Sequence, residues 1–148
     1  LTFNPNANSV VMTLLLDAPN NLLYMGGQFT TVDGQTRNRL AAVNATSGSA
    51  TGWNPNANNQ VFAVAVASGT VYVAGVFSAI GGQTRNRAAS VDPVTAVPTA
   101  WDPNSNGTVR SLVLTSDQVY LAGSFTSVRG EPSGNLAAVT PDASREPL

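Results

Sequence analysis

The sequence contains no cysteine and no histidine, and all seven of its basic residues are arginine. The absence of cysteine excludes disulfides and thiol nucleophiles, and the absence of histidine removes the commonest catalytic base. Without lysine no Schiff-base chemistry is available. Because cysteine and histidine also supply most zinc and transition-metal ligands, we expect no such metal site, no cofactor and no enzymatic activity.

Charge is also scarce. Charged residues make up 10% of the 148 residues and the formal net charge is -1, against roughly 25% charged residues in a typical soluble domain. No block of like charge exists, so we expect no nucleic-acid partner. The longest apolar run, residues 10–16, is far shorter than the ~20 residues of a membrane-spanning helix.

The polar surface must therefore come from asparagine, serine, threonine and glutamine, which we interpret as the surface of an extracellular or cell-surface protein. Because the sequence begins at Leu1, we expect a processed chain or a piece of a longer one.

Three internal repeats are the main signal. Tyr24, Tyr72 and Tyr120 follow each other at intervals of 48 residues, and each opens a Tyr-x-x-Gly-x-Phe segment. An aromatic-x-Pro segment precedes each of them, beginning at Phe3, Trp53 and Trp101. The repeats cover approximately residues 3–52, 53–100 and 101–148 of a single repeat domain. The first is two residues longer, and the excess falls in the turn 17–21.

Each repeat predicts four short strands separated by turn residues. In the second repeat these are residues 61–67, the Tyr-x-x-Gly-x-Phe segment, residues 88–91 and the aromatic-x-Pro-x-x-Asn segment. A repeated unit of this length is typical of a β-propeller blade. We therefore predict an all-β fold of three four-stranded antiparallel blades, forming an incomplete ring or a filament unit. The aromatic side chains expected to pack between blades are Tyr24, Tyr72, Tyr120, Phe29, Phe77, Phe125, Trp53 and Trp101.

Within a repeat the order is aromatic-x-Pro, then Tyr-x-x-Gly-x-Phe-Thr, then Gly-Gln-Thr-Arg-Asn-Arg-Leu-Ala. This order resembles the delta-sixty type propeller repeats of large bacterial and archaeal surface proteins. The resemblance covers nearly the whole chain. It implies a β-propeller, a secreted protein and no assigned enzymatic activity. The third repeat departs from the pattern, because residues 131–135 (Glu-Pro-Ser-Gly-Asn) replace the Gln-Thr-Arg-Asn-Arg of residues 83–87.

Three blades are too few to close around an axis, since propellers have roughly 4–8. We expect the first segment, Phe3, Asn4, Pro5 and Asn6, to be a spare strand that pairs with another chain. The predicted function is therefore structural: the module assembles with copies of itself, or with adjacent repeats of a longer chain, into a ring or fibre. The alternative is a carbohydrate-binding propeller with glycan sites between blades.

Several polar motifs are candidate sites. Arginine and asparagine side chains could grip a carboxylate or a sugar, or could fix the spacing between blades, and their recurrence favours the second interpretation. These side chains are Arg37, Asn38, Arg39, Arg85, Asn86 and Arg87. Asn44 and Asn106 open Asn-x-Thr glycosylation triplets, although turn residues are the simpler interpretation. Residues 102–107 resemble the opening of a calcium loop, but Val113 stands where the loop needs glutamate, so we expect turns rather than calcium.

Overall fold

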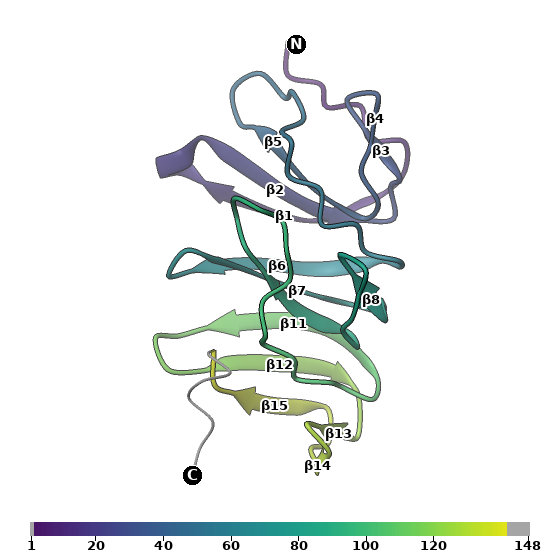
Figure 1. The fold of residues 1–148 in the computed structure, drawn as a ribbon, viewed down its shortest axis with the longest axis vertical. Coiled ribbons are helices and arrows are strands. Elements are labelled where there is room, and N and C mark those ends of the chain that lie inside the picture. Colours follow the sequence, from purple (N-terminus) through teal and green to yellow (C-terminus); the bar gives the residue numbers. More distant parts are fainter. Residues whose placement is uncertain (1, 142–148) are drawn as a thin grey trace.

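Three antiparallel sheets, one for each repeat, form a row in chain order (Figure 1). The structure is a computed structural model and describes residues 2–141. Strands β1, β2 and β5 form sheet 1, strands β6, β7 and β10 form sheet 2, and strands β11, β12 and β15 form sheet 3. No α-helix occurs in residues 2–141, so the predicted all-β class is confirmed.

The strands of the three sheets are β1 (Val11–Asp17), β2 (Leu22–Gly27), β5 (Leu40–Asn44), β6 (Val61–Ala67), β7 (Thr70–Gly75), β10 (Ala88–Val91), β11 (Thr108–Leu114), β12 (Val119–Ser124) and β15 (Leu136–Val139). Each repeat adds a two-stranded hairpin, formed by β3 (Thr31–Val32) with β4 (Gln35–Thr36), β8 (Ala79–Ile80) with β9 (Gln83–Thr84), and β13 (Ser127–Val128) with β14 (Glu131–Pro132). A 3-10 turn, η1 (Ala18–Asn20), lies where the first repeat has its two extra residues. Within residues 2–141 the structure has no helix of the length and hydropathy that a bilayer crossing needs.

The register is the same in all three sheets. The first strand carries an irregularity after Val11, Val61 or Val109, and each of these valines pairs with the glycine of the Tyr-x-x-Gly motif. At Gly75 a Cβ atom would lie 2.1 Å from the carbonyl oxygen of Gln60. Close approach of two backbones is a standard reason for glycine in a strand, and it explains why the motif repeats.

The prediction of a fourth strand in the aromatic-x-Pro-x-x-Asn segment is wrong. The aromatic-x-Pro-x-x-Asn segment is not a strand in any repeat, because Asn6, Asn56 and Asn104 adopt left-handed backbone angles (φ 50°, 62° and 46°). These asparagines follow a proline, which has no N–H to donate to a ladder. The fourth position of sheets 1 and 2 is instead a single antiparallel bridge, Val43 to Ala50 and Val91 to Pro98. Within residues 2–141 the sheets are therefore three-stranded.

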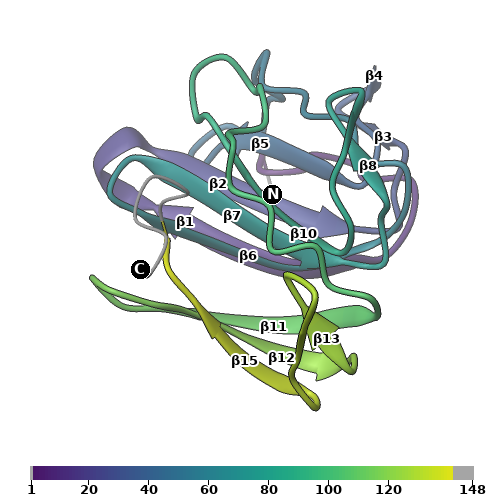
Figure 2. The same ribbon diagram turned by 60° about the horizontal axis from the view of Figure 1, so that its bottom comes forward.

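Neighbouring sheets pack face to face, with β6 in contact with both β1 and β11. One apolar core lies between sheets 1 and 2, and a second lies between sheets 2 and 3. Figure 2 shows that sheet 3 is turned away from the other two and that the row does not close on itself. A third, smaller core lies on the free side of sheet 1, where Ala7 packs near Met25 and Phe29. Every sheet face in the interior of the row is thus covered by the next repeat.

The close backbone approach at the motif glycine generates a stability prediction. We expect Gly75→Ala to lower the free energy of unfolding by about 2–3 kcal/mol, because the new Cβ must displace the backbone of residue 60. Gly52→Ala is the matched control, since a Cβ there would meet no atom within 4 Å. Urea denaturation of both variants checks this, and equal midpoints for the two would contradict it.

Candidate functional site

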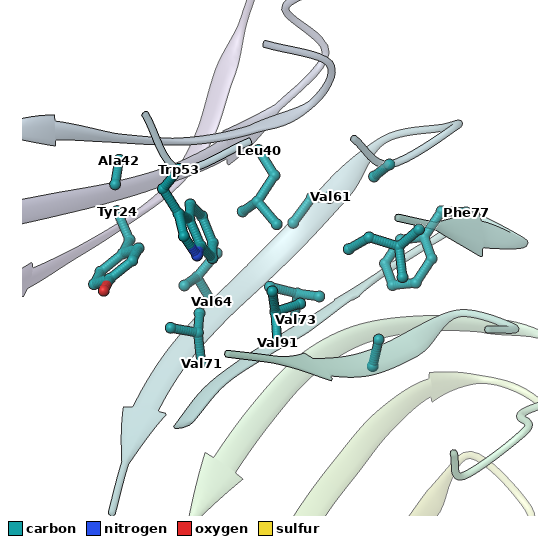
Figure 3. Close-up of a cluster of buried hydrophobic side chains, with 13 residues drawn as sticks. Tyr24, Leu40, Ala42, Trp53, Val61, Val64, Val71, Val73, Phe77 and Val91 are labelled. Atoms are coloured by element: carbon teal, nitrogen blue, oxygen red, sulfur yellow. The ribbon is translucent and has the colours of Figure 1, made fainter. Parts of the chain in front are cut away.

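An edge-to-face aromatic pair stands at each internal junction between sheets. The rings of Tyr24 and Trp53 lie 5.1 Å apart at 79°, and those of Tyr72 and Trp101 lie 5.2 Å apart at 84°. The tyrosine comes from the middle strand of one sheet and the tryptophan from the segment that enters the next repeat (Figure 3). All four residues thus lie between neighbouring sheets.

Each tryptophan is also fixed by a hydrogen bond to its own repeat. Trp53 Nε1 donates to the carbonyl oxygen of Asp92 at 2.9 Å, and Trp101 Nε1 donates to that of Thr140 at 2.8 Å. The predicted phenylalanines Phe29, Phe77 and Phe125 are buried too. Phe77 lies in the core between sheets 1 and 2, and Phe125 lies in the core between sheets 2 and 3.

The two ends of the row each hold one half of such a pair. Tyr120 is 40% exposed, whereas the equivalent Tyr72 is 5% exposed. Phe3 is 38% exposed, whereas Trp53 is 5% exposed. Phe3 lies beside Gly48 of its own repeat, so its position corresponds to that of the tryptophans. One end therefore offers Tyr120 and the other Phe3, and among residues 2–141 neither ring has the aromatic partner found at the internal junctions.

Aliphatic side chains follow the same pattern. Leu40 is 0% exposed in the core between sheets 1 and 2, but Leu136, in the same register position of sheet 3, is 65% exposed. Val64 is 8% exposed, but Leu14, in the same register position of sheet 1, is 59% exposed. Leu14 and Leu136 are therefore apolar side chains that no residue in 2–141 buries.

We call the two surfaces the leading face and the trailing face. The leading face, on sheet 1, consists of Phe3, Val11, Leu14 and Leu16. The trailing face, on sheet 3, consists of Val113, Tyr120 and Leu136. The counterparts of these side chains meet inside the chain at both internal junctions, so the two faces are complementary by construction.

The segment expected to be a free assembly strand is docked on its own repeat. The amide N–H of Asp33 donates to Pro5 O, and the N–H of Asn8 donates to Thr31 O at 3.2 Å. Asn4 Oδ1 accepts the N–H of Asn6 at 3.1 Å. Phe3, Asn4, Pro5 and Asn6 therefore lie against the first repeat in this structure, and strand donation to another chain stays a prediction.

The Arg-Asn-Arg loops act within and between repeats. Arg37 donates to the carbonyl oxygens of Thr36 and Thr51 at 2.7 Å each, and Arg85 makes the equivalent bonds to Thr84 and Thr99. These bonds tie each hairpin to the chain that leaves its sheet. The terminal nitrogens of both guanidinium groups are therefore engaged by the fold, which supports the structural interpretation.

The central asparagine of each loop reaches the next repeat. Asn38 Nδ2 donates to Asn56 Oδ1 and Asn86 Nδ2 donates to Asn104 Oδ1, both at 2.8 Å. Gly134 occupies this position in the third repeat, so the trailing end has no side chain to make the bond.

Arg39 and Arg87 have left-handed backbone angles (φ 67° and 69°) and donate their N–H groups to Phe29 O and Phe77 O. Asn135 does the same in the third repeat (φ 66°). The arginine side chain is thus not needed for this turn. Arg87 and Asn86 line a shallow hollow of about 340 Å³ beside Asn104 and Asn106.

Asn106 is one of three equivalent clamps. Its Oδ1 accepts the N–H groups of Thr126 and Ser127 at 2.9 and 3.0 Å, and its Nδ2 donates to Thr126 Oγ1 at 2.8 Å. Asn8 and Asn58 make the same three bonds without forming a glycosylation triplet. The clamp therefore explains why asparagine recurs here.

Asn44 and its counterpart Asp92 close turns. Asn44 Oδ1 accepts the N–H groups of Thr46 and Ser47 at 2.9 Å each. Backbone N–H groups of Thr95 and Val94 hold the pKa of the Asp92 carboxyl below its usual range. The amide nitrogen of Asn44 takes no part in the two bonds that close its turn, so the glycosylation triplet there stays a prediction.

The calcium-like motif also forms a turn, since Asp102 Oδ1 accepts the N–H of Asn104 at 3.1 Å. Among residues 2–141 no three aspartate or glutamate side chains gather as a metal site would require. Elsewhere, burial raises the pKa of Tyr24 above its ordinary value, and the Asp17 carboxylate adds to the shift. This is the electrostatic consequence of placing a phenol between two sheets.

The aliphatic residues of the two end faces were not among the candidates from sequence. Leu14, Leu16 and Leu136 look like core residues of a strand, and only the open ends of the row make them surface residues. Aligning the repeats places Leu136 at the position of Leu40, which was the available signal. Comparison of the chain with protein-family models, with curated proteins and with solved structures finds no match.

The clamp and the glycosylation triplet at Asn106 can be separated by mutation. We expect Asn106→Ala to destabilise the fold by about 1–3 kcal/mol, because two backbone N–H groups lose their acceptor. Thr108→Ala destroys the triplet but leaves the clamp intact, and we expect a change within about 0.5 kcal/mol. Unfolding midpoints of the purified variants decide, and equal losses in both would show that the clamp is not the cause.

Proposed function

We propose that this chain is a structural module of the β-propeller type, whose task is to associate end to end with further copies of itself. The leading face of one copy packs on the trailing face of the next, repeating the junctions found inside the chain. The low charge, the amide- and hydroxyl-rich composition and the resemblance to delta-sixty type repeats support an extracellular or cell-surface location for the assembly.

One observation carries the proposal: Leu136 is 65% exposed at a position where Leu40 is 0% exposed. Apolar residues in equivalent register that are buried inside a row and exposed at its ends mark an unfinished interface. The contact joins two different surfaces, so it is heterologous and builds either a closed ring or an open filament.

The junction between copies is expected to be weaker than the junctions within the chain. Phe3 has no indole N–H that would fix its ring to its own repeat, and Gly134 has no amide to reach Asn6 of the next copy. Both bonds are present at the internal junctions. Association should therefore be reversible and depend on concentration.

Charge placed on either face tests the proposal. We expect Leu136→Glu and Leu14→Glu each to abolish association, because a carboxylate would have to be buried in an apolar contact. Sedimentation velocity across a concentration series and negative-stain electron microscopy measure the assemblies. Val94→Glu is the control, since Val94 is an exposed valine in a turn away from both faces.

Wild-type protein that is monodisperse and monomeric at micromolar concentration, with a native β-sheet circular dichroism spectrum, would contradict the proposal. Rings or filaments that persist in both glutamate variants would show that other surfaces join the copies.

Phe3, the aromatic residue of the leading face, gives a second test, in which one substitution should strengthen association. We expect Phe3→Trp to tighten association several-fold, because the indole matches the internal junctions and restores a donor toward the Asn44 carbonyl. Phe3→Ala should weaken association, because it removes the ring that faces the tyrosine of the next copy. The ordering Trp, Phe, Ala in sedimentation equilibrium is the expected result, and any other ordering argues against this pairing.

A further inference from the structure

Two clefts open between the sheets at equivalent places in the repeats. The first, between sheets 1 and 2, has a volume of about 340 Å³, and the second, between sheets 2 and 3, about 410 Å³. The Tyr–Trp pair of the junction lines each of them: Tyr24 and Trp53 in the first, Tyr72 and Trp101 in the second. Both volumes fall in the range of roughly 300–1,000 Å³ that small-molecule sites occupy.

The two clefts differ in chemistry although their backbones match. Thr70 lines the second cleft where Leu22 lines the first, and Ser90 stands in the second where Ala42 stands in the first. Ser68, Thr115 and Ser116 add further aliphatic hydroxyl groups to the second cleft, whereas Thr99 has a counterpart, Thr51, in the first. Because leucine and alanine satisfy the same fold positions in the first junction, packing alone does not require the hydroxyls.

The hydroxyl groups form an ordered base and an accessible rim. At the base, the buried hydroxyl of Ser90 hydrogen-bonds that of Thr99, and Thr99 Oγ1 accepts the N–H of Trp101 at 3.2 Å. Tyr72 donates its hydroxyl to Pro141 O at 3.0 Å, which fixes the ring that forms one wall. Thr70 is half-buried and Ser68 and Ser116 are exposed, so these residues form the rim of the cleft. Thr115 Oγ1 accepts the N–H of Gln118 at 3.0 Å and so belongs to its own turn.

The lining selects for a neutral ligand. None of the described side chains that line the second cleft is charged, so these side chains offer an anion or a cation no partner for its desolvation. Hydroxyl groups both donate and accept hydrogen bonds, which suits a ligand that also does both. Aromatic edges and leucine supply apolar contact for the C–H groups of such a ligand.

We propose that the cleft between sheets 2 and 3 binds a neutral saccharide, of mono- or disaccharide size, through its threonine and serine hydroxyls. The site is separate from the end faces, because it lies between two sheets of one chain. Saccharide binding would let an assembled surface layer or fibre attach to a glycan.

The two tryptophans of the chain make the test direct, since each reports on one cleft. The indole N–H resonances of Trp53 and Trp101 are followed in ¹⁵N–¹H spectra, with Trp53→Phe used for assignment. The probes are glucose, galactose, mannose, N-acetylglucosamine, lactose, maltose and cellobiose, with glucuronate as the charged comparison. We expect at least one neutral sugar to move the Trp101 resonance saturably while the Trp53 resonance stays in place.

Thr70→Val should reduce the affinity about tenfold, which corresponds to ~1.4 kcal/mol, because it removes a hydroxyl with little change of shape. Thr70→Leu, which copies the first cleft, should reduce it further. Thr36→Val, on a hairpin outside the cleft, is the matched control and should bind as wild type.

Three results would overturn the proposal: no saturable shift with any neutral sugar, shifts of both indoles that grow linearly with sugar concentration, or unchanged affinity in Thr70→Val. Tighter binding of glucuronate than of glucose would overturn the assignment to neutral sugars. Repeating the titration with Leu136→Glu keeps the question apart from assembly, since that variant should bind the sugar as wild type does.

Discussion

A three-stranded sheet of this size has two apolar faces and no means of burying either one by itself, so the whole molecule depends on one sheet packing against the next. The Tyr–Trp contact is the fixed point of that packing. It joins the middle strand of one sheet to the segment that starts the following repeat, at ring separations of 5.1 and 5.2 Å. The same requirement leaves an open apolar face at each end of any finite row.

The polar network serves this packing. The aromatic-x-Pro segment lies across the outer part of its own sheet because Pro55 O accepts the N–H of Gly81 in the hairpin turn, with equivalent bonds in the other two repeats. The asparagine clamp holds the end of the segment, and the first arginine of each loop holds the chain that leads into it. Hydrogen bonds to amide and carbonyl groups, rather than ion pairs, thus position the aromatic residue. This suits a chain in which only 10% of the residues are charged.

Much of this architecture could be predicted from sequence because the repeat appears three times. The 48-residue spacing, the strands around Tyr72 and the burial of Trp53 and Trp101 all follow from the recurrence of residues with known preferences. The single bridges at the fourth position of sheets 1 and 2 could not be predicted. Asn56 adopts a left-handed backbone conformation with φ 62°. This conformation ends the extended segment, although the residues before it look like those of a strand. The role of Arg37 as a tie between carbonyl oxygens also depends on contacts between residues 14 positions apart, which no local pattern reports.

Where the repeats agree, the fold explains the residue, and where they differ, the fold leaves room for function. Tyr24, Tyr72 and Tyr120 agree because every junction needs the ring. Leu22 and Thr70 differ although both occupy the same place beside that ring. Gly134 replaces the asparagine of Asn38 and Asn86 in the third repeat, at the trailing end of the row. The first difference changes the chemistry of a cleft, and the second removes a side-chain amide from one end of the row. A module that attaches and assembles reversibly, as we propose, would need both changes, and the three repeats carry them without altering the packing that holds each sheet in place.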